Sequence, residues 1–129
     1  MKKVLDILKD KNVVIGSKGA SNAAITEAET ELSVLFDKEY KDYLSSVGFA
    51  IYDGHELTGI CKAKRLNVVD VTIRNRAIFN DVPDDWYVIE EAHIDGIVIW
   101  QDADGKVYQT APGADSLKIA DSLVDYIKL

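Results

Sequence analysis

A histidine and a glutamate stand side by side in the run Asp53-Gly54-His55-Glu56. A histidine can act as a general base when a carboxylate orients its ring. Adjacent residues of an extended segment point to opposite faces of a sheet, so Glu56 cannot orient His55. Asp-Gly is also strongly favoured in tight hairpin turns. The sequence therefore favours a turn followed by a strand edge over a catalytic pair.

Glu90 and Glu91 form a second pair of residue types that occur in catalysis. Glycosidases place two carboxylates on either side of the bond that they cleave. Neighbours on one strand face away from each other, which excludes this arrangement for Glu90 and Glu91. No nucleophile elbow, metal motif or dinucleotide fingerprint is present in the sequence. We therefore expect no enzymatic activity.

The other reactive side chains are few and far apart. Cys61 is the single cysteine, and His93 is the only histidine besides His55. These residues do not supply the four ligands of a structural zinc site. Residues 102–105 lack the later ligands of a calcium loop, and residues 16–19 lack the glycine-lysine spacing of a phosphate loop. We expect no metal and no cofactor, a small buried Cys61 and a solvated His93.

Acidic residues dominate the second half of the chain. The formal net charge is −7, and residues 81–105 carry eight acids and no Lys or Arg. Direct nucleic-acid binding is disfavoured, because affinity for phosphate backbones comes mainly from cationic side chains. Such a surface speeds association with a basic protein, although the same charge also serves solubility, and the sequence leaves both roles open. The candidate residues for contact with a basic partner are Asp84, Asp85, Glu90, Glu91, Asp95, Asp102 and Asp104.

Length and composition indicate one soluble domain spanning residues 1–129, with 47% hydrophobic and 29% charged residues. No apolar run approaches the roughly 20 residues needed to span a bilayer. Asp6 and Asp10 interrupt what would be the core of a signal peptide. We expect a cytoplasmic protein that begins near Met1 and does not associate with membranes.

The first half of the chain has helical patterns with capping signals. Residues 2–9 have helical spacing, and residues 13–15 are a short extended piece before a loop over 16–22. Thr26 and Glu29 have the spacing of a capping box, which predicts a helix starting there with Leu35 on its apolar side. Asp37 is the expected N-cap of a further helix, which Gly48 is expected to end.

The second half alternates between extended and helical patterns. We expect strands at 49–52 and 56–60, a helix at 68–79, and three strands at 86–91, 97–102 and 106–110. The strand around Trp100 is apolar throughout, so Trp100 is expected in the core. A last helix is predicted over 116–128. Because tight turns join antiparallel neighbours, the fold class is α+β, a mainly antiparallel sheet of about five strands with helices packed on it.

Six runs of the sequence form a further pattern: Ile25-Thr-Glu-Ala-Glu29, Glu39-Tyr-Lys-Asp-Tyr-Leu44, Gly54-His-Glu-Leu-Thr-Gly-Ile60, Trp86-Tyr-Val-Ile89, Gly96-Ile-Val-Ile-Trp-Gln-Asp-Ala-Asp-Gly-Lys-Val-Tyr108 and Ser122-Leu-Val-Asp-Tyr-Ile127. In order and content these runs resemble the SUKH superfamily, which includes fungal regulators of cell-wall synthesis and many small bacterial proteins. The resemblance runs from about residue 24 to the C-terminus and is preceded by the helix and loop of residues 1–23.

This resemblance implies a single SUKH-like domain that binds other proteins and is not an enzyme. Small bacterial members are similar to immunity proteins, which neutralise a cognate toxin, often a nuclease. A basic toxin domain is therefore the expected partner. A regulatory protein-interaction module without a toxin partner is the alternative. Contact residues vary among such proteins, so none is transferred to this chain from the family.

Overall fold

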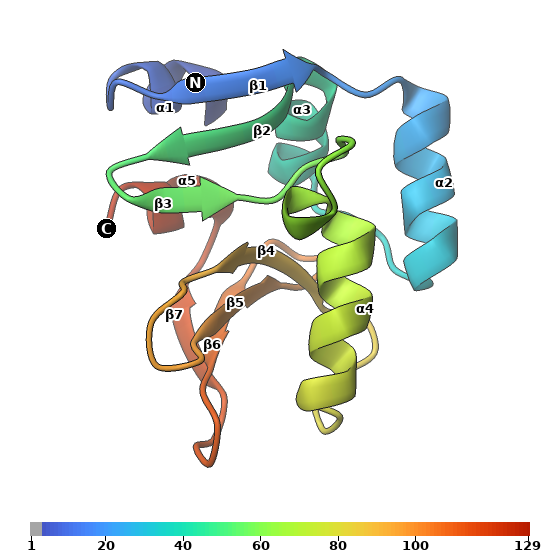
Figure 1. The fold of residues 1–129 in the computed structure, drawn as a ribbon, viewed down its shortest axis with the longest axis vertical. Helices are drawn as coiled ribbons and strands as arrows, with labels where there is room; N and C mark the ends of the chain where they lie inside the picture. The colour runs from blue at the N-terminus through green and yellow to red at the C-terminus, as the bar shows by residue number, and fades with distance from the viewer. Residues whose placement is uncertain (1–3) are drawn as a thin grey trace.

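Seven strands form one antiparallel sheet in which every strand pairs with its neighbour in the sequence (Figure 1). The computed structural model describes residues 4–129. The predicted α+β class with a mainly antiparallel sheet is confirmed, although the sheet has seven strands and not about five. The strands are β1 Val14–Lys18, β2 Val47–Tyr52, β3 His55–Leu57, β4 Tyr87–Glu91, β5 Val98–Gln101, β6 Val107–Thr110 and β7 Leu117–Ala120.

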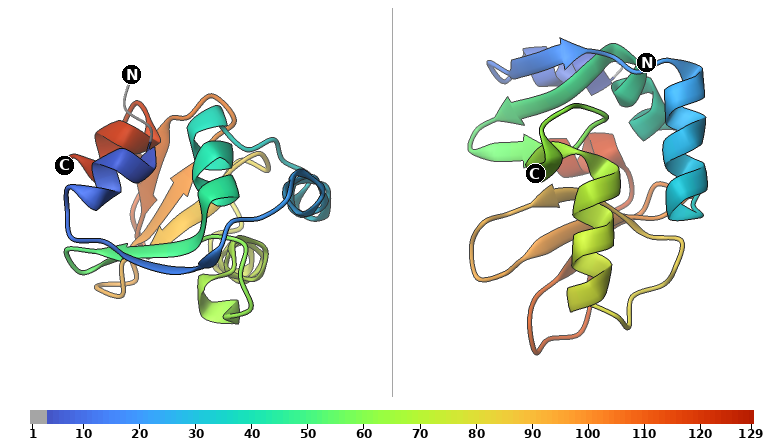
Figure 2. Two further views of the ribbon diagram at one scale, coloured as in Figure 1. Left: turned by 90° about the horizontal axis from the view of Figure 1, so that it is seen from above. Right: turned by 45° about the vertical axis from the view of Figure 1, so that its right-hand side comes forward.

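Helices pack on both faces of this sheet. Figures 1 and 2 show α1, α3 and α5 on one face, α4 on the other face beside β4, and α2 at the side of the molecule. None of the helices described between residues 4 and 129 has the length and apolar character needed to cross a bilayer. The helices are α1 Val4–Lys9, α2 Asn22–Leu32, α3 Lys38–Ser46, α4 Val68–Ile78 and α5 Leu123–Ile127, with a short 3-10 helix η1 at Lys64–Leu66. The start of the helix predicted over 2–9 lies outside the described residues.

The sheet separates two hydrophobic cores. The larger core lies on the side of α1, α3 and α5 and contains the fully buried Tyr40, Leu44 and Tyr87. The smaller one lies between α4 and the strands β4 and β5, around Val71 and Trp100. Trp100 is completely buried, as its apolar strand predicted. Because both faces of β4 and β5 are covered, these strands are apolar on both sides.

The start of α2 differs from the prediction. Ser21 is the N-cap residue, and its hydroxyl accepts a hydrogen bond from the backbone N–H of Ala24 at 3.1 Å. Thr26 lies one turn inside the helix, so the capping-box interpretation of Thr26 and Glu29 is wrong. The Asp37 cap of α3 is confirmed, because its carboxylate accepts a hydrogen bond from the N–H of Glu39 at 3.0 Å. Each short polar side chain satisfies a donor that the helix itself leaves unpaired.

Ser21→Ala is expected to lower the free energy of unfolding by about 1 kcal/mol, because it removes the α2 cap. Thr26→Ala is the matched control on the same helix. It is expected to change stability by less than about 0.5 kcal/mol, because Thr26 is exposed. Urea unfolding followed by tryptophan fluorescence measures both. Equal losses of unfolding free energy in the two variants would contradict the assignment of Ser21, and not Thr26, as the N-cap residue of α2.

Two other segments also differ from expectation. Gly48 does not end α3 but lies within β2, because the chain enters the strand directly at Val47. The helix predicted over 116–128 is instead β7 followed by α5. Leu117 and Ala120 pair with β6, which would otherwise be the edge of the sheet. Ser122 then caps α5 by accepting a hydrogen bond from the N–H of Asp125 at 3.0 Å.

An irregularity in β4 decides where its two glutamates point. The register with β5 shifts between Val88 and Glu90, so Val88 pairs with Trp100 and Glu90 pairs with Ile99. The extra residue of this bulge turns Glu90 toward the larger core. Glu91 then lies on the opposite face, against α4. The prediction that the two carboxylates face away from each other is therefore confirmed.

Candidate protein-binding groove

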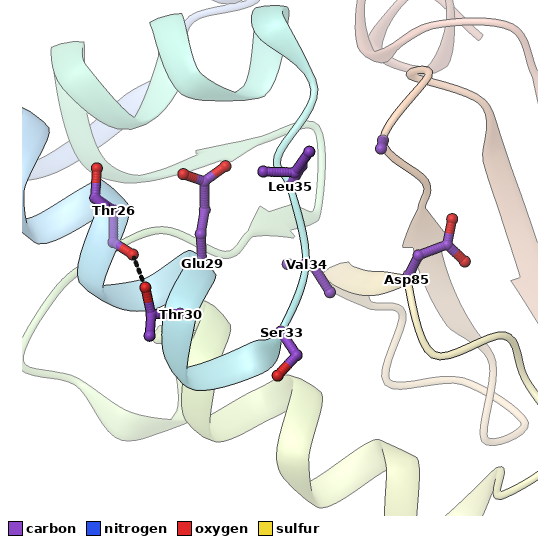
Figure 3. A pocket seen from close by; sticks show the side chains of 8 residues that line it. Thr26, Glu29, Thr30, Ser33, Val34, Leu35 and Asp85 are labelled. Atoms are coloured by element: carbon purple, nitrogen blue, oxygen red, sulfur yellow. Dashed lines mark hydrogen bonds between the residues drawn. The ribbon is translucent and has the colours of Figure 1, made fainter.

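A shallow groove of about 460 Å³ lies between α2 and the loops at one end of β4 and β5 (Figure 3). One wall consists of α2 residues and of the segment 33–35 that follows the helix. The other wall contains Asp85, just before β4, and Ala103, just after β5. Segments far apart in the sequence therefore form the two sides of one open surface.

An exposed leucine stands in the first wall. Ser33 ends α2 in the left-handed conformation, with φ 56°, and its backbone N–H bonds back to the carbonyls of Glu29 and Thr30. The chain then alternates, so that Val34 and Phe36 are buried while Leu35 remains 67% exposed. The expectation that Leu35 belongs to the apolar side of the helix is wrong, because the helix ends before it. Leu35 is thus an apolar side chain presented to solvent at the groove.

Buried hydrogen bonds fix the first wall to the sheet. The Glu29 carboxylate accepts a hydrogen bond from the N–H of Phe36 at 2.8 Å and pairs with Lys41 at 3.6 Å. The Asp37 N–H donates to the hydroxyl of Tyr87 at 2.9 Å, and that hydroxyl donates to Gln101 at 2.7 Å. Burial raises the pKa of Tyr87 well above its usual value, so the hydroxyl stays protonated and keeps donating. The 33–37 segment is therefore held in one position.

The second wall is held in a similar way by Asp102. This carboxylate accepts hydrogen bonds from the N–H groups of Asp104 and Lys106, each at 3.0 Å, and from the hydroxyl of Tyr108 at 2.9 Å. Burial and this bond to Asp102 raise the pKa of Tyr108 to about 12, so Tyr108 remains a donor at neutral pH. Gln101 also donates to the carbonyl of Gly105 at 3.0 Å. The turn after β5 is thereby rigid, and both walls are preformed.

The groove joins two parts of the chain that lack basic residues. Residues 19–37 and residues 77–105 contain no Lys or Arg, and each borders one wall. Glu27 and Glu31 are exposed on α2, and Asp85 and Asp104 are exposed on the opposite side. Lys41 and Arg76 both reach this region, since Lys41 pairs with Glu29 at 3.6 Å and Arg76 donates to the backbone carbonyl of Asp84 at 2.9 Å. The groove therefore combines an exposed apolar side chain, Leu35, in one wall with an exposed acidic side chain, Asp85, in the other.

The structure separates the predicted contact residues into four groups, of which the last is the buried pair Glu90 and Asp102. Asp84, Asp85 and Asp104 are exposed at the groove end of β4 and β5. Asp95 is also exposed, but it lies in the connection between β4 and β5, at the opposite end of these antiparallel strands. Glu91 is half-buried on the sheet face against α4, where Arg74 contacts it at 2.7 Å and Asn75 at 2.8 Å.

Glu90 and Asp102 are corrections to that set. Their residues are only 2% and 8% exposed, so they have almost no surface to offer a partner. Both carboxylates are instead used inside the protein, Asp102 in the turn after β5 and Glu90 between β3, β4 and α5. The strand pattern of the sequence did not reveal the bulge that turns Glu90 inward.

Glu90 is also the carboxylate that His55 contacts. The Nδ1 atom of His55 lies 3.0 Å from Glu90, the N–H of Glu56 donates to Glu90 at 2.9 Å, and the hydroxyl of Tyr126 donates to it as well. The His55 ring stacks on Tyr52, with 5.0 Å between the ring centroids. The cluster ties β3 and α5 to β4, which gives His55 and Glu90 a structural role. Within residues 4–129, no three His, Cys, Asp or Glu side chains gather as a metal ion would require.

Sequence reasoning missed Leu35 and the acidic residues of α2. A signal was present, because no Lys or Arg occurs between Lys18 and Lys38. The sequence did not show, however, that this segment lies beside Asp85 and Ala103, which follow Leu35 by about 50 and about 70 residues. Only the fold brings them together.

Comparison with solved structures identifies a protein with the same fold. A crystal structure of a protein from Pseudomonas syringae pv. tomato superimposes with a TM-score of 0.70. The match covers 97% of this chain and 96% of that chain, with 15% sequence identity. Among curated proteins, no sequence matches significantly. The SUKH_5 family model, described as SMI1-KNR4 cell-wall, matches residues 1–128. This match also covers residues 1–23, which the resemblance noted in the sequence did not include. The chain therefore belongs to the SMI1-KNR4 family of SUKH domains.

Proposed function

We propose that this chain is a non-enzymatic immunity protein that binds a basic toxin domain and blocks it directly inside the cell. The observation that carries the proposal is the groove beside α2, where the exposed Leu35 in one wall faces the exposed Asp85 in the other, and both lie in stretches of sequence that contain no Lys or Arg. Membership in the SUKH domains is consistent with a binding scaffold.

The chemistry of the groove suits a partner with a cationic surface. Nuclease toxins need such a surface to bind the phosphates of their substrates. An acidic inhibitor that occupies the surface associates rapidly, because long-range attraction steers the encounter. Apolar side chains at the centre of an interface supply most of the binding energy once water is excluded. Leu35 provides this apolar contact, Asp85 lines the opposite wall, and the exposed Asp104 follows Ala103 of that wall.

Co-expression tests the proposal. The C-terminal domain of a toxin encoded next to this chain's gene is expressed with and without the chain. We expect the chain to restore growth and to co-purify with the toxin domain as a stoichiometric complex. Absence of both rescue and complex would refute the proposal for that toxin.

A pair of matched charge reversals tests the groove. Asp85→Lys combined with Asp104→Lys is expected to slow association with the toxin domain by roughly tenfold at low salt, and the difference is expected to shrink at high salt. Asp115→Lys combined with Asp125→Lys makes the same change in net charge at exposed positions outside the groove. This control is expected to slow association much less. Equal slowing in the two variants would show that overall charge, and not the groove, attracts the partner.

A regulatory interaction module is the second candidate, and the cell-wall description of the matching family favours it. In this case the groove binds a host protein and no toxin. Crosslinking from position 35 in cells, followed by mass spectrometry, distinguishes the two. A toxin domain as the main crosslinked protein supports immunity, and a non-toxic protein that is lost on Asp85→Lys and Asp104→Lys supports regulation.

A further inference from the structure

The sheet has a second unusual surface, on the face of β1–β3 against which none of the α-helices described between residues 4 and 129 packs. Figure 1 shows α1, α3 and α5 behind these strands and α4 beside β4. Val14 pairs with Ile51, and Gly16 pairs with Phe49, so these residues share one face. Val14 is 61% exposed, and Phe49 and Ile51 are half-buried. An apolar strip therefore runs across β1 and β2 in contact with solvent.

The absence of a side chain at Gly16 lets the Phe49 ring lie flat against β1. A Cβ atom built at Gly16 would lie 1.9 Å from two carbon atoms of the Phe49 ring, so the ring lies directly over the glycine. Gly16 belongs to the glycine-containing run that superficially resembles a phosphate loop. Gly16, Ser17 and Lys18 belong to β1, so the loop predicted over 16–22 is wrong at its start, and the close approach of an aromatic ring accounts for the glycine. The floor is consequently flat and apolar.

Next to Phe49 the strip widens into an open hollow of about 620 Å³. Its lining combines apolar surface from Phe49, Ile60 and Ala63 with the side chains of Lys18 and Lys62. Cys61 also lines it, and burial raises the pKa of this thiol, so it stays uncharged at neutral pH. The hollow therefore has an apolar base and a positive rim.

The two lysines are available for a ligand. Arg65, close by in the sequence, is held by the Glu56 carboxylate through two hydrogen bonds of 3.0 and 2.8 Å. Within residues 4–129, by contrast, no ion pair involves Lys18 or Lys62. Both side chains are exposed. Two unpaired positive charges thus flank one apolar hollow in a protein whose net charge is −7.

β1 is also an edge strand. It pairs with β2 on one side, and in the described part of the chain no other strand pairs with its outer side. The outer N–H and C=O groups of an edge strand can pair with an added strand, as many peptide-binding domains show. An extended segment lying along β1 would also reach the hollow beside Lys18.

We propose that this surface, formed by Val14, Lys18, Phe49, Ile51 and Lys62, binds an extended acidic segment of a partner protein that carries an apolar anchor residue. The anchor lies on Phe49 in the hollow, and flanking carboxylates pair with Lys18 and Lys62. Charge complementarity selects this occupant, because a basic segment is repelled by the rim. A second copy of this chain would place the same unpaired lysines on both sides of the contact. The proposal is independent of the acidic groove and of the partner that binds there.

Titration of the full chain with a synthetic peptide tests the proposal. The probe is acetyl-Asp-Glu-Leu-Phe-Glu-Asp-amide, added to 15N-labelled protein and followed by amide chemical shifts. Saturable shifts are expected in residues 13–18, 47–52 and 60–63, and none is expected at residues 26–35. A second peptide with lysine at every acidic position is expected to bind at least roughly tenfold more weakly.

Two double variants of equal net charge distinguish the effect of the rim lysines from the effect of overall charge on peptide binding. Lys18→Glu combined with Lys62→Glu is expected to weaken binding of the acidic peptide by roughly tenfold or more. Lys9→Glu combined with Lys128→Glu has the same net charge but changes exposed lysines of α1 and the C-terminal end, and it is expected to weaken binding much less. Phe49→Ala removes the floor and is expected to abolish the response to the anchor residue. Thermal unfolding confirms that each variant is folded before it is titrated.

Several results would overturn the proposal. One is the absence of saturable shifts with the acidic peptide, and another is equal binding of the two peptides. A third is binding of the protein to vesicles of phosphatidylcholine and phosphatidylglycerol when the peptide does not bind, which would assign the surface to an anionic membrane. A concentration-dependent dimer that Phe49→Ala dissociates would assign it to self-association. None of these results depends on whether a toxin binds the groove.

Discussion

Replacing Glu90 by alanine is expected to lower the free energy of unfolding by about 3 kcal/mol. Glu90 is almost completely buried and accepts hydrogen bonds from the N–H of Glu56 and the hydroxyl of Tyr126. Burial and the nearby Glu90 raise the pKa of Tyr126, so its hydroxyl is protonated at all ordinary pH values and must find an acceptor. Alanine leaves the buried Tyr126 hydroxyl and the part-buried N–H of Glu56 without this acceptor, whereas the half-exposed ring of His55 can turn to water.

Two variants serve as controls for this prediction. Glu91→Ala removes the neighbouring carboxylate, which is half-buried and bonded to Arg74 and Asn75, and it is expected to destabilise by only about 1 kcal/mol. Glu90→Gln keeps the shape of the side chain and one acceptor oxygen. Its loss of unfolding free energy is expected to lie between the losses of Glu90→Ala and Glu91→Ala. Urea unfolding measures all three. A Glu90→Ala loss no larger than that of Glu91→Ala would mean that the cluster around Glu90 adds nothing to stability.

Gly59→Ala is expected to destabilise the fold by at least about 3 kcal/mol, through overpacking that the neighbours cannot relieve. A Cβ atom at Gly59 would lie 1.8 Å from the carbonyl oxygen of Gly48. That oxygen belongs to the backbone of β2, so it cannot move aside as a flexible side chain would. Gly59 cannot retreat either, because its N–H donates to Leu66 and its carbonyl accepts from Val68.

Gly113→Ala is the matched control. At Gly113, in contrast to Gly59, nothing lies within 4 Å of the position that a Cβ atom would take. Its φ of 76° is unfavourable for alanine, and this strain alone is expected to lower stability by about 1 kcal/mol. Circular dichroism and thermal unfolding compare the two variants. Similar melting temperatures would show that the backbone around Gly48 is more compliant than the contact implies.

The sequence predicted those elements that local chemistry determines. Asp37 caps α3, and Asp53 and Gly54 form the turn between β2 and β3, because both signals act within a few residues. Most strands followed from their apolar pattern in the same way. The α4 helix lies at Val68–Ile78, within a residue of its predicted bounds, and its N-cap is Asn67.

The errors have tertiary causes. Leu117 and Ala120 have helical spacing with the residues of α5, yet pairing with β6 makes them a strand. Gly48 has the residue type of a helix end, but it lies in β2, which the chain enters directly at Val47. At the candidate site, the acids at 84, 85 and 104 were predicted as exposed contacts. Glu90 was placed in the same set because sequence alternation does not reveal a β-bulge.

The sheet is continuous, but neighbouring strands do not all pair over the same number of residues. The register of β3 with β4 consists of a single residue pair, Leu57 and Glu90, and the chain between these strands is the longest connection in the second half of the fold. Neighbouring hairpins close short loops and form early, whereas pairing across a long connection carries a larger entropic cost and forms late. The β3–β4 pairing is therefore expected to be the weakest backbone pairing in the sheet. Because Glu90 belongs to this pair, amide exchange in the native protein should open there before global unfolding.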